Sequence, residues 1–146
     1  MLIDVENSPL NYLELAAKLL SNPISAAEGR DMIIRALDER AEYEKYDLLL
    51  KNLVRKAGLF PYLSSEFKIH DLEDLVTIEA NKPNINKNII FHSTQTRVYN
   101  ELIKGNNVVL SAPTSMGKSE ILSNILNSEK YHTIVLIVPT IALIDE

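Results

Sequence analysis

Apolar and polar positions in the first part of the chain recur with the period of an α-helix. The first helix is expected to begin at Ser8-Pro9, since Ser can cap free amides and Pro fits the first helical position, and to end near Pro23. A second helix is expected after Ser25, which with Glu28 has the spacing of a capping box. Gly29 slightly lowers the helix propensity of its first turn. Each helix presents one apolar face.

The third helix has the clearest pattern. Apolar residues keep the helical period for three turns over 46–57, and Gly58 is a suitable residue to end the helix. Residues 59–63 are expected to form an apolar turn beneath these helices, and a fourth helix is expected over about 66–78. That helix depends on only three apolar residues, which are Leu72, Leu75 and Val76. The sequence therefore predicts an acidic, all-helical domain over residues 1–80.

The composition changes sharply at residues 81–90. Four Asn and one Pro in these ten positions are typical of a connector. Three isoleucines in the same segment can anchor it, so the connector need not be flexible. The domain boundary is placed in this segment, which separates the helical domain from residues 91–146.

The remaining part of the chain has the order helix, strand, helix, strand. Its first helix is expected to begin at Ser93 or Thr94. It is followed by a strand over 108–110, a helix over 118–126 and a fully apolar strand over 133–138. Continuous apolar strands joined through a helix indicate a βαβ unit in a buried parallel sheet. The predicted fold class is α/β, with a parallel sheet that follows the all-helical domain.

The loop after the first strand has the pattern of a phosphate-binding P-loop, Ala112-x-x-x-x-Gly117-Lys118-Ser119, with Ala in place of the first Gly. The amides of residues 115–119 can form a nest for phosphate oxygens, helped by the positive end of the following helix. Gly117 lets the backbone approach the phosphate closely. Lys118 can place a cation between the β- and γ-phosphates, and the Ser119 hydroxyl can ligate Mg²⁺. The nucleotide-binding residues expected in the loop are Thr114, Ser115, Met116, Gly117, Lys118 and Ser119.

This loop, Ala-Pro-Thr-Ser-Met-Gly-Lys-Ser, resembles motif I of superfamily 2 helicases, in the form used by the DExH and Ski-like branch. Residues 91–95, Phe-His-Ser-Thr-Gln, place Gln95 17 residues before Ala112 and resemble the Q motif, whose Gln reads adenine. Pro139 and Thr140 follow the second strand and resemble motif Ia, which touches the nucleic-acid backbone in that family. The resemblance departs from DEAD-box proteins at Ile141, where they usually carry Arg or Lys.

The resemblance implies that residues 91–146 are the first part of a RecA-like ATP-binding domain. It also implies ATP and Mg²⁺ as cofactors, adenine recognition by Gln95, and contact with DNA or RNA through Pro139 and Thr140. In the full protein, Mg²⁺-ATP at the P-loop would drive closure of two RecA-like domains on a nucleic-acid strand. The chain then corresponds to the amino-terminal portion of an ATP-dependent helicase or translocase.

Two other functions remain open at this point. The P-loop is also compatible with a different enzyme, such as a nucleotide kinase or an ABC-type ATPase. Alternatively, the helical domain is a protein-interaction module, and the nucleotide site attached to it is incidental.

Residues 141–146 offer a misleading match. Four apolar residues followed by Asp-Glu have the pattern of a Walker B strand, with its metal carboxylate and catalytic acid. We reject this match because the preceding strand ends at Pro139, and the six residues leave no room for the crossover of about a dozen residues that a parallel strand needs. No catalytic residue is therefore assigned, and the Walker B carboxylates are expected beyond residue 146.

Charge and composition narrow the functional classes further. The net charge of -5 comes from residues 1–80, which hold 9 Lys and Arg against 15 Asp and Glu, whereas residues 81–146 hold 6 against 5. Neither part is a basic nucleic-acid patch, so contact with nucleic acid would depend on local geometry. The chain has no Cys, no signal-peptide pattern and no apolar run near the roughly 20 residues of a membrane helix. An intracellular, cytoplasmic protein without membrane contact is expected.

We expect the 146-residue chain to hydrolyse no appreciable ATP, because no catalytic carboxylate is assigned within it. Phosphate release by the purified chain with Mg²⁺-ATP should stay at background. Steady turnover that disappears in Lys118→Ala would contradict this expectation and would restore Asp145 and Glu146 as Walker B candidates.

Overall fold

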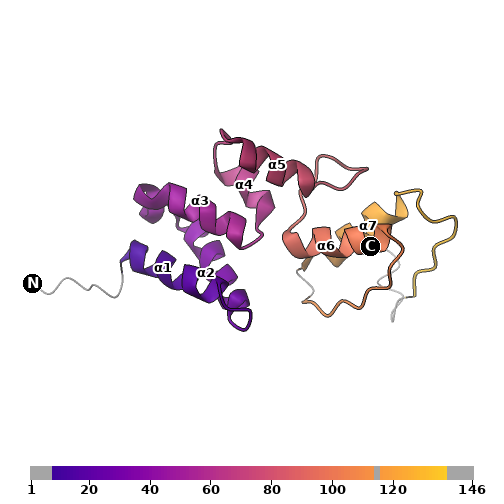
Figure 1. The fold of residues 1–146 in the computed structure, drawn as a ribbon, viewed down its shortest axis with the longest axis horizontal. Helices are drawn as coiled ribbons and strands as arrows, with labels where there is room; N and C mark the ends of the chain where they lie inside the picture. Colours follow the sequence, from indigo (N-terminus) through magenta and orange to yellow (C-terminus); the bar gives the residue numbers. More distant parts are fainter. Residues whose placement is uncertain (1–7, 114–115, 138–146) are drawn as a thin grey trace, which may run out of the picture.

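The structure is a computed structural model that describes residues 8–113 and 116–137. Within these ranges the chain forms seven α-helices and one 3-10 helix, η2 (Figure 1). Helices α1 to α5 form one group, and α6 and α7 pack against each other beside it (Figure 1). In chain order the elements are α1 (Pro9–Leu20), α2 (Ala26–Asp38), η2 (Arg40–Tyr46), α3 (Asp47–Lys56), α4 (Phe60–Glu66), α5 (Leu72–Ala80), α6 (Ser93–Ile103) and α7 (Lys118–Leu126).

Helices α1 and α2 pack closely at Gly29. A Cβ atom added to Gly29 would lie 2.8 Å from the Leu20 amide nitrogen and 3.0 Å from the Ala16 carbonyl oxygen. Both distances are shorter than ordinary van der Waals contact, so a larger residue would push the two helices apart. Gly29 is therefore required by the packing of α1 on α2, beyond the mild helical penalty that the sequence suggests.

The caps of the first two helices differ from each other. Ser8 caps α1 as predicted, since its hydroxyl oxygen accepts a hydrogen bond from the Asn11 amide at 3.2 Å. The predicted capping box at Ser25 is wrong, because the Ser25 hydroxyl donates to the Leu19 carbonyl oxygen at 3.1 Å and no side chain caps α2. Carbonyls at the end of a helix lack intrahelical donors, and Ser25 satisfies one of them.

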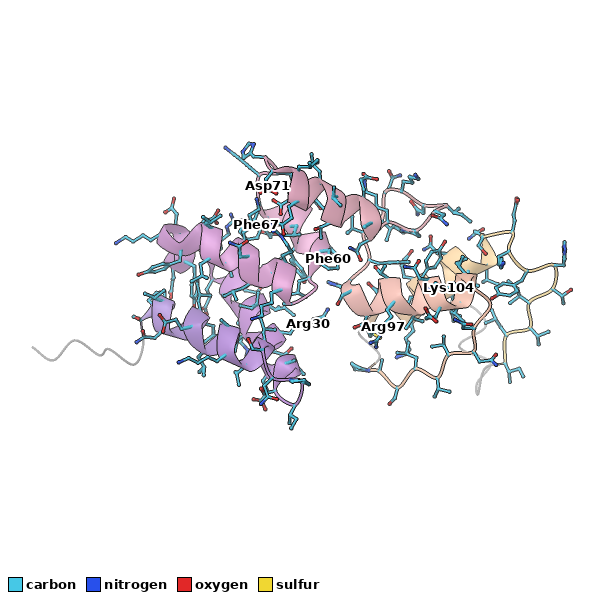
Figure 2. All side chains as sticks on the ribbon, in the orientation of Figure 1. Arg30, Phe60, Phe67, Asp71, Arg97 and Lys104 are labelled. Atoms are coloured by element: carbon cyan, nitrogen blue, oxygen red, sulfur yellow. The ribbon has the colours of Figure 1, made fainter. Side chains whose placement is uncertain are left out.

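Residues 59–63 do not form the expected turn. Phe60–Glu66 form helix α4, and Pro61 lies in its first turn, where a missing amide costs no helical hydrogen bond. The chain then continues to Phe67, a buried residue labelled in Figure 2. The Arg40 guanidinium lies 4.2 Å from the centre of the Phe67 ring and covers it as a cation–π contact.

Helix α5 begins later than predicted, at Leu72. Asp71 is its N-cap and accepts a hydrogen bond from the Asp74 amide at 2.8 Å, which fixes the start of the helix. The buried positions of α5 are Asp74 and Ile78. The three apolar residues that predicted this helix are instead exposed: Leu72 (75%), Leu75 (51%) and Val76 (59%).

A buried carboxylate joins α5 to α3. The Asp74 side chain is fully buried and forms ion pairs with Lys51, and with Arg55 at 2.5 Å. Lys51 also contacts Asp71 at 3.0 Å, and Arg55 contacts Glu73 at 2.5 Å. The hydrogen bond to Asp74 raises the pKa of Lys51 above its ordinary value despite burial. Because each buried charge has an opposite partner, the cluster fixes α5 on α3.

Two groups of buried apolar residues form the core. The larger group lies within the helical unit, which we define as α1 to α5, and it includes Leu13, Ala16, Ile33, Leu50, Val54, Leu59 and Leu63. The smaller group lies between α6 and α7 and comprises Phe91, Val98, Tyr99, Ile121 and Ile125.

The connector at 81–90 is anchored by polar contacts as well as by isoleucines. Asn81 accepts hydrogen bonds from the Phe91 amide at 2.8 Å and from the Thr96 hydroxyl at 2.6 Å. Ile89 packs against the smaller apolar group and Ile90 against the larger one. The connector thus has fixed contacts, while the domain boundary within it stays a prediction.

The two predicted strands are absent from the described residues. Neither 108–110 nor 133–137 pairs with another segment there, and Val109 (101%) and Ile137 (92%) are exposed. A strand exists only through hydrogen bonds to a neighbouring strand, and the described chain provides none for these segments. The described structure is therefore all-helical, which corrects the α/β expectation for this part.

Helices α6 and α7 form as predicted, with His92 at the N-cap of α6 in place of Ser93 or Thr94.

Replacing Asp74 with Asn should lower the free energy of unfolding by about 3 to 5 kcal/mol, because two buried cations lose their shared carboxylate. Denaturation by urea, followed by circular dichroism, measures this loss. Glu73→Gln is the control, since the Glu73 side chain is 72% exposed and a surface ion pair contributes less than about 1 kcal/mol. Equal effects of the two substitutions would show that the Asp74 cluster does not hold α5 in place.

Candidate functional site

The junction between the P-loop and α7 is built around Gly117. This residue has a φ of 77°, in the left-handed region, and is the N-cap of α7. A Cβ atom there would lie 2.6 Å from the Gln95 Nε2 atom, so glycine is required by conformation and by space. No side chain caps α7. The amides of its first turn therefore have no side-chain cap, and their binding to an anion stays a prediction.

Lys118 follows directly and turns back over the start of the loop. Its Nζ atom donates hydrogen bonds to the Ala112 carbonyl oxygen at 2.9 Å and to the Pro113 carbonyl oxygen at 2.7 Å. A phosphate oxygen is a charged acceptor and forms a stronger hydrogen bond with an ammonium group than a neutral carbonyl does. The side chain is therefore held where an incoming phosphate can compete for it.

Gln95 joins the start of α6 to the P-loop. Its side chain is 7% exposed, its Oε1 atom accepts from the His92 amide at 2.8 Å, and its Nε2 atom donates to the Gly117 carbonyl oxygen at 3.4 Å. Both ends of the amide have partners in this conformation. Adenine recognition would require one of them to be released, and the longer hydrogen bond to Gly117 is the weaker of the two.

The other predicted site residues fall into two groups. Met116 is half-buried beside Gly117, and Ser119 is exposed in the first turn of α7. Outside the described residues lie Thr114, Ser115, Pro139, Thr140 and the rejected Walker B match at 141–146.

A cavity of about 520 Å³ lies between the helical unit and the P-loop. This volume is within the range of small-molecule sites. One wall comes from the chain around the loop and the start of α6, and the opposite wall comes from α2 and α4 of the helical unit. Its lining includes Arg30, Tyr62, His92, Gln95, Pro113 and Met116.

A second hollow of about 300 Å³ lies at the other side of Gln95. It is lined by Pro61 and Phe91 together with Gly117 and Glu120. His92, Gln95 and Met116 line both spaces, so the site has two adjoining compartments that meet at these three residues.

The sequence does not indicate that α2 and α4 contribute to this site. Arg30 and Tyr62 belong to no motif, and their side chains reach the cavity only because the helical unit packs against the start of α6. No sequence signal distinguishes them from other polar residues of amphipathic helices. Only the tertiary contacts of the helical unit identify them.

Those contacts are close. The Tyr62 and His92 rings lie 6.1 Å apart, and the Ser93 amide donates to the Gly58 carbonyl oxygen at 3.0 Å. Gly58 has a φ of 68°, and a Cβ atom there would lie 2.1 Å from the Ser93 hydroxyl oxygen.

Burial lowers the pKa of His92, and the positive charge of Arg30 acts in the same direction. The imidazole is therefore neutral at pH 7, which removes one positive charge from the cavity wall.

The residues present suit a nucleotide phosphate better than a metal held by protein side chains alone. The glycine, the lysine and the uncapped helix start are all groups that bind phosphate oxygens. Within residues 8–113 and 116–137, no cluster of three or more His, Asp or Glu residues is placed to hold a metal ion. A Mg²⁺ ion would therefore need the oxygens of the nucleotide in addition to the Ser119 hydroxyl.

Two protein families match the chain. The family described as "Anti-bacteriophage protein B N-terminal domain" matches residues 3–75, which are half of the chain. The family described as "DEAD/DEAH box helicase" matches residues 92–146 and confirms the resemblance to these helicases. The second match begins at His92, next to the segment in which the sequence places a domain boundary.

Two curated relatives are similar to this chain. Anti-bacteriophage protein B of Escherichia coli (strain K12) is 48% identical over 139 residues, which are 95% of this chain and 19% of the relative. The protein translocase subunit SecA of Acidobacterium capsulatum is 35% identical over 130 residues, which are 80% of this chain and 13% of the relative. The chain thus spans a fifth or less of these proteins. No solved structure matches it.

None of the helices in the described parts of the chain has the length and apolar character needed to cross a bilayer.

Replacing Gln95 with Ala should lower the free energy of unfolding by about 1 to 3 kcal/mol, because the buried amide of His92 and the Gly117 carbonyl lose their partner. Urea denaturation of both proteins measures the difference. Asn100→Ala is the control, since Asn100 is an exposed amide on the same helix and its loss should change stability by about 0.5 kcal/mol or less. If both variants unfold alike, Gln95 does not join α6 to the loop in solution.

Proposed function

Since the chain belongs to the anti-bacteriophage protein B N-terminal domain family and continues into the start of a DEAD/DEAH box helicase domain, we propose that it is the ATP-binding amino-terminal portion of an ATP-dependent nucleic-acid helicase or translocase. The name of its relative in Escherichia coli suggests that the larger protein acts against bacteriophage. The DEAD/DEAH box match favours this function over a nucleotide kinase or an ABC-type ATPase.

The observation that carries this proposal is the arrangement of Gly117, Lys118 and Gln95 at the start of α7. A left-handed glycine, an uncapped helix start and an ammonium group lie together at the start of α7, and the ammonium group donates to the carbonyls of two residues that line the cavity, Ala112 and Pro113. Together they supply amide donors and a positive charge for phosphate oxygens. The loop residues Thr114, Ser115 and Met116 complete the proposed phosphate site.

The same arrangement supports binding of a base beside Gln95. Its amide has one acceptor and one donor atom, which match the exocyclic amino group and the neighbouring ring nitrogen of adenine. The two compartments that meet at Gln95 provide space for the base and ribose. Gln95 would exchange its hydrogen bond to Gly117 for one to adenine.

The proposed organisation keeps the three parts of the sequence. Residues 1–80 form the helical domain, 81–90 the connector and 91–146 the first part of a RecA-like domain. Two separate apolar groups on either side of the connector support this division. Ser119 is the proposed Mg²⁺ ligand, and Pro139 and Thr140 are the proposed contacts to DNA or RNA.

The chain should bind Mg²⁺-ATP, and Lys118→Ala should weaken this binding by about 10-fold or more, because the variant loses a charge-assisted contact to phosphate. Isothermal titration calorimetry with the 146-residue chain measures both affinities. Lys104→Ala removes the same charge from the exposed C-cap position after α6 and should leave binding unchanged.

The preference for adenine over guanine is tested by titrating GTP in the same experiment. Wild type should prefer ATP, and Gln95→Ala should reduce the ratio of ATP to GTP affinity, since the loss of one adenine contact changes the ratio even if the fold is weakened. Equal binding of ATP by wild type and Lys118→Ala would refute a phosphate site at the P-loop.

A further inference from the structure

Arg30 is a cationic residue of the helical unit that faces the P-loop. It lies on α2, is half-buried, and lines the same cavity as Ser111, Ala112 and Pro113. Figure 2 shows Arg30 on the side of the helical unit that faces α6. A positive charge from the first part of the chain therefore enters the space beside the proposed phosphate site.

This guanidinium lacks a partner within the described part of the chain. It makes no hydrogen bond or ion pair with any other described residue. The other half-buried or buried cations of the helical unit behave differently, because Arg40, Lys51 and Arg55 are each paired with at least two carboxylates. Arg30 is thus the exception among them.

The nearest carboxylate to Arg30 acts on its charge without forming an ion pair. Burial lowers the pKa of Arg30, and Asp31, an exposed neighbour that makes no ion pair with it, acts in the opposite direction. Guanidinium groups stay protonated in proteins regardless of such shifts. Among the described residues that line the cavity, Asp31 carries the only carboxylate, and the polar side chains His92 and Thr94 are neighbours without a carboxylate. A partly desolvated cation of this kind is stabilised by an anion that enters the cavity.

We propose that Arg30 pairs with the phosphate chain of the nucleotide held by the P-loop, so that the helical unit supplies part of the nucleotide site. This inference rests on the proposed function. Guanidinium groups bind phosphate oxygens through two parallel hydrogen bonds, which suits a ligand with several such oxygens. The nucleotide then has Lys118 on one side and Arg30 on the other.

The consequence is a link between the two parts of the chain. A ligand that contacts both the helical unit and the P-loop stabilises their packing, in addition to the contacts of Gly58 with Ser93 and of Tyr62 with His92. The stability of the packing between the helical unit and the P-loop would then depend on whether nucleotide is bound.

The test measures the affinity of the 146-residue chain for Mg²⁺-ATP and for inorganic tripolyphosphate by isothermal titration calorimetry. Arg30→Ala should weaken both by about 10-fold or more, since a hydrogen-bonded contact to a charged group is lost. Arg35→Ala is the matched control, because Arg35 is exposed on the same helix and does not line the cavity. Circular dichroism checks that each variant is folded.

The outcomes separate this inference from the proposed function. Unchanged ATP binding in Arg30→Ala, together with a loss in Lys118→Ala, would overturn the role of Arg30 and leave the P-loop assignment standing. Weaker binding of ATP with unchanged binding of tripolyphosphate would also overturn it, since Arg30 would then contact the base or ribose. A wild-type chain that binds no ATP would refute the proposed function and this inference with it.

Discussion

The hydrogen bonds of the Gln95 side chain are the constraint on which the site depends. They join the first turn of α6 to Gly117, and thereby place the start of α7 against the start of α6. The position of Gly117 in turn sets where the amides of α7 and the Lys118 ammonium lie. The same residue lines both compartments of the site. A single buried amide therefore links α6 to the start of α7 and also borders the space beside the loop.

The helical unit is held to this site by contacts that need close approach of backbones. Gly58 accepts from the Ser93 amide at a distance of 3.0 Å and leaves no room for a Cβ atom. Within the unit, Gly29 allows α1 to pack on α2, and the buried carboxylate of Asp74 fixes α5 on α3. These contacts are long-range and specific, so the wall formed by α2 and α4 has a defined position beside the P-loop.

Under the proposed function, the acidic helical unit would form one wall of a nucleotide site. The unit is negatively charged overall, yet its cavity wall presents Arg30 without a carboxylate partner in the described chain. The net charge of the unit therefore does not show where a single cation such as Arg30 lies, and charge counts alone are a poor guide to a site for an anion. The match to a DEAD/DEAH box helicase begins next to this wall, at residue 92.

The sequence by itself determined what depends on near neighbours. Helical period predicted α1, α2, α3, α6 and α7, and the spacing of glycine, lysine and serine located the loop. Only the tertiary structure decided α4, the start of α5 and the contribution of Arg30 and Tyr62, because burial there depends on residues far apart in the chain. For the same reason 108–110 and 133–137 form no strand in the described structure, since an apolar run pairs only with a neighbouring strand.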